Sequence, residues 1–405
     1  MGTIKKWYRS GESAIWLSGT AVAASITIVF GLLILIAVNG LSHFWPTQVA
    51  EFQYQLDDEK SQVLVGEVRD QELIATRRVA ESGTWLAQPD EESPQRLLIK
   101  TGNRELYGLD FRWLVAGNIT RIEHPANLVV LERLEWGNYY GYLQRVTTAD
   151  GVVTEGESAR AVMEASIAAA LEIREKIVDL EKVEIGRINY AMEKLRLRER
   201  GLELEQRLDQ RAQQQLDDER AELDARYKVL QSELADLYTR VNSDQLLLVD
   251  ASGRESEISV GHVVRAYYPN SFSFAEKIGF YAAKAWEFVS DDPREANTEG
   301  GIFPAIFGTV VMVLVMSVLV TPFGVLAAVY LREYARQGIV TRIVRIAVNN
   351  LAGVPSIVYG VFGLGFFVYF LGGNIDQLFF PEALPAPTFG TPGLLWSSLT
   401  LALLT

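Results

Sequence analysis

The chain has 405 residues, no cysteine, a hydrophobic fraction of 49% and a formal net charge of −13 at pH 7. This length predicts two or more structural units. The acidic excess lies between residues 50 and 300 and argues against a nucleic-acid-binding protein, which would present a basic face. The lack of cysteine excludes disulfides and thiolate metal sites, and the separation of His43, His124 and His262 disfavours a histidine metal site.

The first predicted element is a transmembrane helix over residues 16–41, preceded by a cytoplasmic segment over residues 1–15. Residues 16–41 contain no charged side chain, and this length is enough to cross a hydrocarbon core of roughly 30 Å. The alternative is a cleaved signal peptide, which predicts a shorter apolar region of about 7 to 15 residues. Phe44 and Trp45 follow the stretch, where a membrane interface favours aromatic residues, so we expect a retained span.

Residues 42–271 are predicted to form an extracytoplasmic domain that contains a β module. Short β-type runs end at turn residues, such as residues 97–101 before Gly102 and residues 139–146 before Gly151. The same pattern returns over residues 246–265. We therefore assign the β module to residues 60–155 and 244–268, with a helical insertion between the two parts.

The insertion, residues 157–243, is rich in Ala, Glu, Leu, Arg and Gln, which is typical of long helices. Its second half has a leucine at every seventh position, and its first half has a looser apolar stripe; the positions are Leu216, Leu223, Leu230, Leu237, and Met163, Ile167, Ala170, Ile173, Ile177, Leu180. This pattern predicts an antiparallel coiled-coil hairpin with its tip near Gly201. The arm is either a docking or spacing element, or two helices that are simply solvated by their charges.

An amphipathic helix is predicted over residues 272–292. Six apolar side chains share roughly one face of it: Phe274, Ile278, Tyr281, Ala282, Ala285 and Trp286. This face either lies in the lipid headgroup region or packs on the β module. Because the next membrane span follows closely, we expect the interfacial position.

Three further apolar blocks follow, predicted as spans over residues 300–331 and 346–373 and as the start of a fourth over residues 393–405. The basic residues Arg332, Arg336, Arg342 and Arg345 assign the loop 332–345 to the cytoplasm. The loop 374–392 and residues 42–300 are then extracytoplasmic. Since about a dozen residues cannot span a bilayer, we expect the natural protein to continue past Thr405.

Three stretches resemble the permease family of phosphate ABC importers: Glu299–Thr309 (EGGIFPAIFGT), Thr321–Ala335 (TPFGVLAAVYLREYA) and Asn349–Gly360 (NNLAGVPSIVYG). The last is similar to the second of the two permease subunits. The resemblance is strong over about the last hundred residues and weak over the first span. It implies an α-helical polytopic membrane protein of the ABC importer type I permease class, here with an extracytoplasmic α+β domain where most members have a short loop.

The resemblance also implies partners: a second permease, a cytoplasmic ATPase dimer and an extracytoplasmic phosphate-binding protein, in a bacterial inner membrane. The motif that grips the ATPase is expected beyond residue 405. The chain lacks a Gly-x-x-x-x-Gly-Lys-Ser/Thr motif for nucleotide binding, so we expect a non-catalytic subunit without cofactors, whose partner hydrolyses ATP. The alternative function is a membrane-anchored sensor or scaffold that binds a partner through its coiled-coil domain.

Candidate residues for the translocation path or the permease interface are polar, small or helix-breaking residues within apolar stretches. They are Thr309, Pro322, Asn349, Asn350, Gly353, Pro355, Ser356 and Tyr359. Small residues allow close helix approach, and proline and glycine free backbone groups at membrane depth. Ordinary helix packing is the alternative role for each of them.

Overall fold

The structure is a computed structural model, and it describes residues 12–57, 59–81, 84–86, 93–336, 338–351 and 353–403. The predicted cytoplasmic residues 1–11 and the last two residues of the chain lie outside these ranges. The described chain falls into two compact units. Unit 1 holds residues up to 144 together with 248–256 and 265–301, and unit 2 holds residues 145–247, 257–264 and 302 onward.

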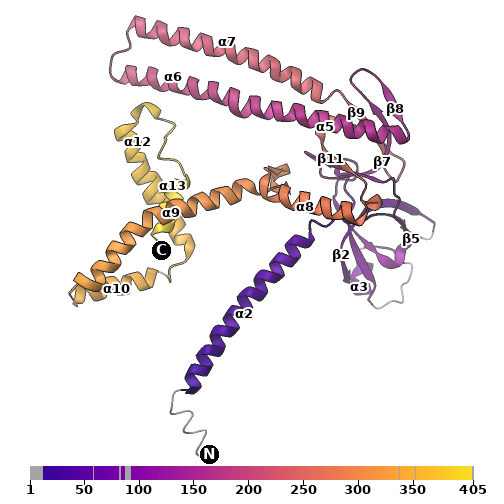
Figure 1. Cartoon of the computed structure of the whole chain (residues 1–405), viewed down its shortest axis with the longest axis horizontal. Helices are drawn as coiled ribbons and strands as arrows, with labels where there is room; N and C mark the ends of the chain where they lie inside the picture. Colours follow the sequence, from indigo (N-terminus) through magenta and orange to yellow (C-terminus); the bar gives the residue numbers. More distant parts are fainter. Residues whose placement is uncertain are drawn as a thin grey trace, which may run out of the picture. The chain divides into compact units, whose positions relative to one another are not determined.

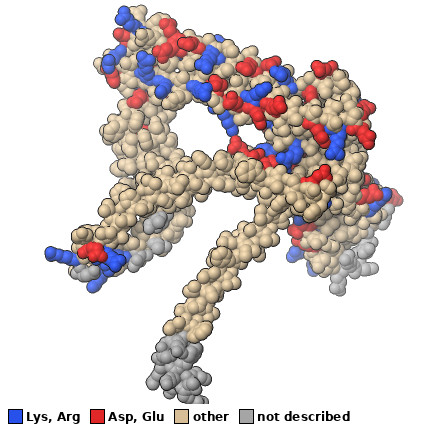
Figure 2. Space-filling model, in the orientation of Figure 1, with Lys and Arg blue, Asp and Glu red and all other residues tan. Residues whose placement is uncertain are grey.

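Within the described residues, three helical segments are long and apolar enough to cross a membrane: Ile15–Ser42, Phe303–Tyr334 and Ser356–Phe379. The first lies in α2 (Glu12–Ser42) and the second in α9 (Phe303–Val329) with the π-helical turn η6 (Tyr330–Tyr334). The third joins α11 (Ser356–Phe362), η7 (Gly363–Gly372) and α12 (Gly373–Phe379). In Figure 2, α2 and α9 are free of charged side chains over most of their length. These helices indicate a multi-pass membrane protein.

The third span differs from its predicted bounds of 346–373. Residues 346–351 belong to a separate helix, α10 (Ile339–Leu351), and the spanning helix starts at Ser356. Gly353 and Pro355 separate the two helices, because proline disfavours helical geometry in the residue before it and cannot donate a backbone hydrogen bond. The predicted loop 332–345 is largely helical, since η6 and α10 cover most of it.

The first sheet of unit 1 has five antiparallel strands in the order β4-β3-β2-β1-β5. Their bounds are β1 Val49–Gln55, β2 Ser61–Leu73, β3 Gln95–Lys100, β4 Phe111–Val115 and β5 Ile119–Glu123. In β1, Ala50, Phe52 and Tyr54 point into the core while the residues between them are more exposed, as the two-residue period of a strand requires. This sheet starts eleven residues before the predicted module boundary at residue 60, because β1 already belongs to it.

A second sheet follows the order β10-β9-β7-β6-β11, and β8 pairs with β7. Its strands are β6 Val129–Arg133, β7 Tyr139–Thr147, β8 Val153–Glu155, β9 Gln245–Val249, β10 Glu255–Ser259 and β11 Val263–Tyr267. One buried apolar cluster joins the two sheets. It consists of Val49, Val65, Leu128, Val130 and Tyr140. Gly141 permits close packing, since a Cβ there would lie 2.6 Å from the carbonyl oxygen of Val249.

The last part of unit 1 is α8 (Phe274–Ser290), followed by the two-stranded hairpin β12 (Pro293–Arg294) and β13 (Glu299–Gly300). The Ser273 hydroxyl oxygen caps α8 by accepting a hydrogen bond from Glu276 N, and Ser273 N donates one to the Glu276 carboxylate, which is a capping box. Short helical turns connect the remaining elements: α3 Thr76–Glu81, α4 Arg104–Tyr107, η1 Ala116–Asn118, η3 Val260–His262, η4 Pro269–Ser271 and η5 Glu295–Asn297.

The arm of unit 2 is a helical hairpin over residues 157–241 (Figure 1). Its first half runs through α5 (Glu157–Asp179), the π-helical turn η2 (Leu180–Ile185) and α6 (Gly186–Leu204), and its second half is α7 (Gln210–Val241). Five residues of the predicted stripe in the first half are buried: Met163, Ile167, Ala170, Ile177 and Leu180. In α7 the first and last leucines of the seven-residue repeat, Leu216 and Leu237, are buried. The turn lies at residues 205–209, just beyond the predicted tip at Gly201, and Asp209 caps α7 through Ala212 N.

The membrane segment of unit 2 packs around α13 (Leu394–Ala402), which contacts α9, η7 and α11. Phe367, Val368 and Trp396 form its apolar core. The short turn η8 (Pro381–Ala383) in the connection before α13 contacts α6 of the arm. Basic side chains gather at the end of this segment formed by η6 and α10, as Figure 2 shows.

Candidate functional site

Five of the predicted site residues meet at the break between α10 and α11. Gly353 N donates a hydrogen bond to Asn350 O at 3.0 Å, which ends α10 in a tight turn. Pro355 is extended and precedes Ser356, the first residue of α11. The hydroxyl of Tyr359 then reaches back and donates to Leu351 O at 2.7 Å. The break therefore places backbone polar groups and a phenol together inside an apolar segment, the arrangement found where irregular backbone lines a cavity or a protein contact.

The other predicted residues lie elsewhere. Thr309 and Pro322 are both on α9, and the Thr309 hydroxyl donates to Ala305 O at 2.7 Å within its own helix. Thr321 does the same toward Ser317 O at 2.6 Å, one residue before the proline. The side chain of Asn349 lies outside the described set.

A buried carboxylate organises the connection between the third spanning helix and α13. Asp376 is fully buried and accepts hydrogen bonds from Phe389 N at 2.9 Å and Gly390 N at 2.6 Å. Trp396 Nε1 donates to Phe389 O at 2.7 Å from the other side. The sequence signal was a lone acidic residue after a long apolar stretch, and the prediction of a loop over 374–392 overlooked its role as a hydrogen-bond acceptor.

Two glycines allow the same segment to pack closely. A Cβ at Gly363 would overlap the side chain of Thr400 on α13, and a Cβ at Gly372 would overlap the carbonyl group of Phe389. Gly365, on the same stretch, has open space around it. Small residues at contacts are the usual device for close helix packing in membranes, so Gly363 and Gly372 act in packing.

Unit 1 contains a cavity of about 740 Å³ that sequence patterns did not predict. Charged side chains of both signs line it. Most come from β2, β3, β6, α4, α8 and the β12–β13 hairpin. These residues are Glu67, Arg69, Lys100, Arg104, Asp110, Glu132, Lys284, Glu287, Arg294, Glu295 and Glu299. Phe44 and Phe288 contribute apolar side chains to the lining. The cavity is therefore polar and its charges come from positions far apart in the chain.

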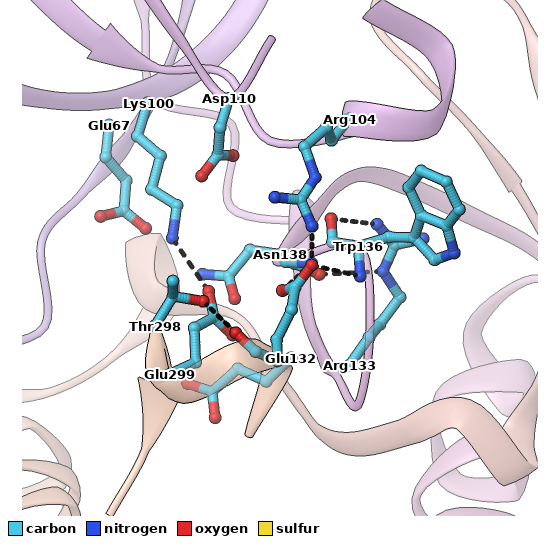
Figure 3. Close-up of polar contacts among 12 residues, drawn as sticks. Glu67, Lys100, Arg104, Asp110, Glu132, Arg133, Trp136, Asn138, Thr298 and Glu299 are labelled. Carbon is cyan, nitrogen blue, oxygen red and sulfur yellow. Dashed lines mark hydrogen bonds and ion pairs between the residues drawn. The ribbon is translucent and has the colours of Figure 1, made fainter. Parts of the chain in front are cut away.

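The cations of this cavity are bound to its carboxylates. Lys100 Nζ lies 3.4 Å from Glu299 Oε1, and Arg104 forms an ion pair with Glu295. The Glu295 carboxylate also accepts hydrogen bonds from Trp136 N at 3.1 Å and Gly137 N at 3.0 Å. Figure 3 shows Lys100 pointing to Glu299. These contacts fasten residues 293–300 to the rest of the module.

A second group of ion pairs fixes α8. Lys284 lies 2.5 Å from Glu132 on β6, and Glu287 lies 3.1 Å from Lys284, 3.1 Å from Arg265 and 3.2 Å from Arg294. Burial acts to raise the pKa of Glu287, but these three cations outweigh it and hold the pKa below the ordinary value. Burial, with the charges of nearby Arg69 and Lys100, lowers the pKa of His43. Among the described residues no group of three or more His, Asp or Glu side chains is placed to hold a metal ion.

Comparison with known proteins shows similarity to phosphate permeases. The chain is 37% identical over 87 residues to the phosphate transport system permease protein PstA of Mycobacterium leprae, covering 21% of this chain and 28% of that one. It is 42% identical over 73 residues to PstA 1 of Mycobacterium tuberculosis strain H37Rv, covering 18% and 23%. It is 27% identical over 157 residues to PstC of Mesorhizobium japonicum, covering 36% and 46%. These matches support the phosphate permease family.

The similarity is partial. The chain spans about a quarter of the length of the PstA relatives and less than half of the PstC relative. No family model matches the chain, and no solved structure matches it. The membrane helices and the relatives together describe a permease-like, multi-pass membrane protein, in agreement with the predicted class.

Proposed function

We propose that the chain is a transmembrane permease subunit of an ATP-driven importer of inorganic phosphate, and that it forms the translocation path with a second permease. The similarity to PstA and PstC proteins carries this proposal, and the three membrane-spanning helices support it. The version of the 349–360 stretch in this chain favours the second of the two subunits. Its partners are then a cytoplasmic ATPase dimer and an extracytoplasmic phosphate-binding protein.

The mechanism assigned to the chain follows from this role. ATP binding and hydrolysis on the partner rock the two permeases between inward-open and outward-open states, and phosphate passes between them. The break at Gly353 and Pro355 is our candidate for the path or the permease interface. It brings irregular backbone together with the hydroxyls of Ser356 and Tyr359 at the start of the third spanning helix.

Uptake of labelled phosphate tests the proposal in cells that make the protein. Loss of its gene should abolish ATP-dependent phosphate uptake, with sulfate uptake unchanged as the matched anion control. Tyr359→Phe, which removes the hydrogen bond to Leu351 O, should lower the uptake rate. Tyr369→Phe, on an exposed face of the same spanning helix, should not. Unchanged phosphate uptake in the deletion strain would overturn the transport function.

The proposed topology places the arm outside and the η6–α10 end inside the cell, following the positive-inside rule. These 405 residues include no cysteine, so a single introduced cysteine reports its own location. Gln214→Cys on the arm should react with a membrane-impermeant maleimide in intact spheroplasts, and Glu333→Cys should react only after permeabilisation. The reverse pattern would refute this orientation.

The arm is proposed as a docking element for the binding protein or for the partner permease. Its charged surface and its contact with η8 near the membrane segment motivate this role. Deleting residues 157–243 should lower the rate or the affinity of phosphate uptake while the chain still inserts into the membrane. Uptake with unchanged rate and affinity would leave the arm with no docking role.

A further inference from the structure

Helix α8 has two different faces. On one face, Phe280, Lys284 and Glu287 pack against the module, and Phe280 lies 4.7 Å from the ring of Tyr267. On the opposite face, Phe274 and Trp286 are each 71% exposed and Ile278 is 49% exposed. Both interpretations left open by the sequence, packing on the module and an apolar surface facing outward, therefore apply to different sides of one helix.

The exposed face is continuous and apolar. Phe274, Ile278, Ala282 and Trp286 follow one another at four-residue intervals, which places them along one side of the helix. Ala275, Gly279 and Val289 border this line and are also exposed. We call these seven residues the α8 stripe. A soluble surface rarely exposes such a large apolar strip without a partner.

The position of α8 in unit 1 identifies that partner. The membrane-spanning segment of α2 ends at Ser42, and the next rings, Phe44 and Trp45, contact α8. Trp45 meets the start of α8, with 6.3 Å between its ring and that of Phe274, and Phe44 meets the end, with 5.1 Å between its ring and that of Phe288. Helix α8 therefore lies across the point where the chain leaves the membrane, and Figure 1 shows it beside the end of α2.

The length of α2 places this point at the bilayer surface. The 28 residues of Ile15–Ser42 reach about 42 Å at roughly 1.5 Å per residue, longer than a hydrocarbon core of roughly 30 Å. The end of α2 is then at headgroup level, where tryptophan and other aromatic side chains are enriched. Trp45, Phe274 and Trp286 meet this description.

We infer that the α8 stripe is a membrane-docking surface, which inserts into the boundary between lipid headgroups and acyl chains and holds the module against the bilayer. The opposite, polar face fixes α8 to the module, because Lys284 and Glu287 form ion pairs with residues of β6 and β11. The partner is the lipid surface itself. This role does not depend on what the chain transports.

Two neighbouring alanines provide a matched test. Ala282 lies in the α8 stripe and Ala283 is displaced by 100° around the helix; both are exposed. In the full chain without other cysteines, Ala282→Cys and Ala283→Cys are each labelled with an environment-sensitive fluorophore and reconstituted into phosphatidylglycerol–phosphatidylethanolamine vesicles. The label at 282 should show blue-shifted emission and several-fold stronger quenching by doxyl-labelled lipid. The label at 283 should be quenched by aqueous iodide instead.

Equal iodide quenching at both positions would overturn the inference, and so would a label at 282 that neither quencher reaches, since protein would then cover the stripe. Adding Ile278→Glu and Trp286→Glu to the Ala282→Cys chain should abolish the lipid quenching. Trp286 and Ile278 face away from the ion pairs, so the module should keep its fold, checked by unchanged protease resistance. Lipid quenching that survives both glutamates would contradict the proposal.

Discussion

Lys284 on α8 forms an ion pair with Glu132 on β6, with 2.5 Å between Nζ and Oε2, and both side chains are largely buried. Lys284→Met should destabilise the module by about 3 to 5 kcal/mol, because it leaves the Glu132 charge buried without its partner. Thermal unfolding in detergent measures this. Lys284→Met with Glu132→Gln should recover part of the loss, since the buried charge is then also removed. A double variant no more stable than the single variant would contradict the explanation.

The pH dependence of the module should depend on Glu287. Burial opposes ionisation of this carboxyl, but Lys284, Arg265 and Arg294 outweigh it and depress its folded-state pKa below 4.5. A depressed pKa stabilises the fold above the unfolded-state value and the contribution is lost as pH falls through the folded-state value. We expect the free energy of unfolding to decrease as the pH falls below about 4.5.

Glu287→Gln checks this assignment. The variant should be less stable than the wild type at pH 7. Its stability should also fall less steeply between about pH 5 and pH 3, the range in which a carboxyl group titrates. Glu257→Gln, at a side chain that is 66% exposed, should keep the wild-type acid profile. An acid limb of equal slope in the wild type and in Glu287→Gln would exclude Glu287 as its source.

Gly372 and Gly365 give a second matched pair, in the membrane segment. A methyl group at Gly372 meets the backbone of Phe389, whereas one at Gly365 meets nothing within 4 Å. Gly372→Ala should therefore cost about 1 to 3 kcal/mol through overpacking, and Gly365→Ala should be neutral or slightly stabilising. Thermal unfolding in detergent compares them. Equal stability of the two variants would show that residues 389–390 move aside without cost.

The periodic features of this fold could be predicted from sequence, and the contacts between distant segments could not. Charge-free stretches located the spans because apolar length alone drives a helix into lipid. An apolar face of α8 was predicted from a 3.6-residue period. Lys284, on the opposite face, pairs with Glu132, which lies 152 residues away, and no local pattern joins the two. The alternation in β1 was present in the sequence, with Phe52 and Tyr54 inward, but the predicted module boundary at residue 60 left it out.

The candidate site shows the same division. Gly353 and Pro355 were predicted to disturb a span over residues 346–373, whereas the structure ends α10 at Leu351 and begins α11 at Ser356, so they separate two helices. The cavity of unit 1 could not be predicted, since Lys100 and Glu299 are 199 residues apart in the chain and meet only through the fold. The hydrogen bonds of Asp376 depend on a loop whose path the sequence does not specify.

Asp376 should control the order of the loop between α12 and α13. Asp376→Ala removes the acceptor for Phe389 N and Gly390 N. We expect stability to fall by about 3 kcal/mol, because hydrogen bonds to a charged acceptor contribute about 1.5 to 3 kcal/mol each. The loss is not larger because the freed amides can partly bond to water. Asp376→Asn keeps one carbonyl oxygen and should lose less. Protease cleavage between residues 380 and 393, followed in membranes, should be fastest for alanine, slower for asparagine and slowest for the wild type. Equal cleavage rates in all three chains would mean that Trp396, through its bond to Phe389 O, is enough to hold the loop.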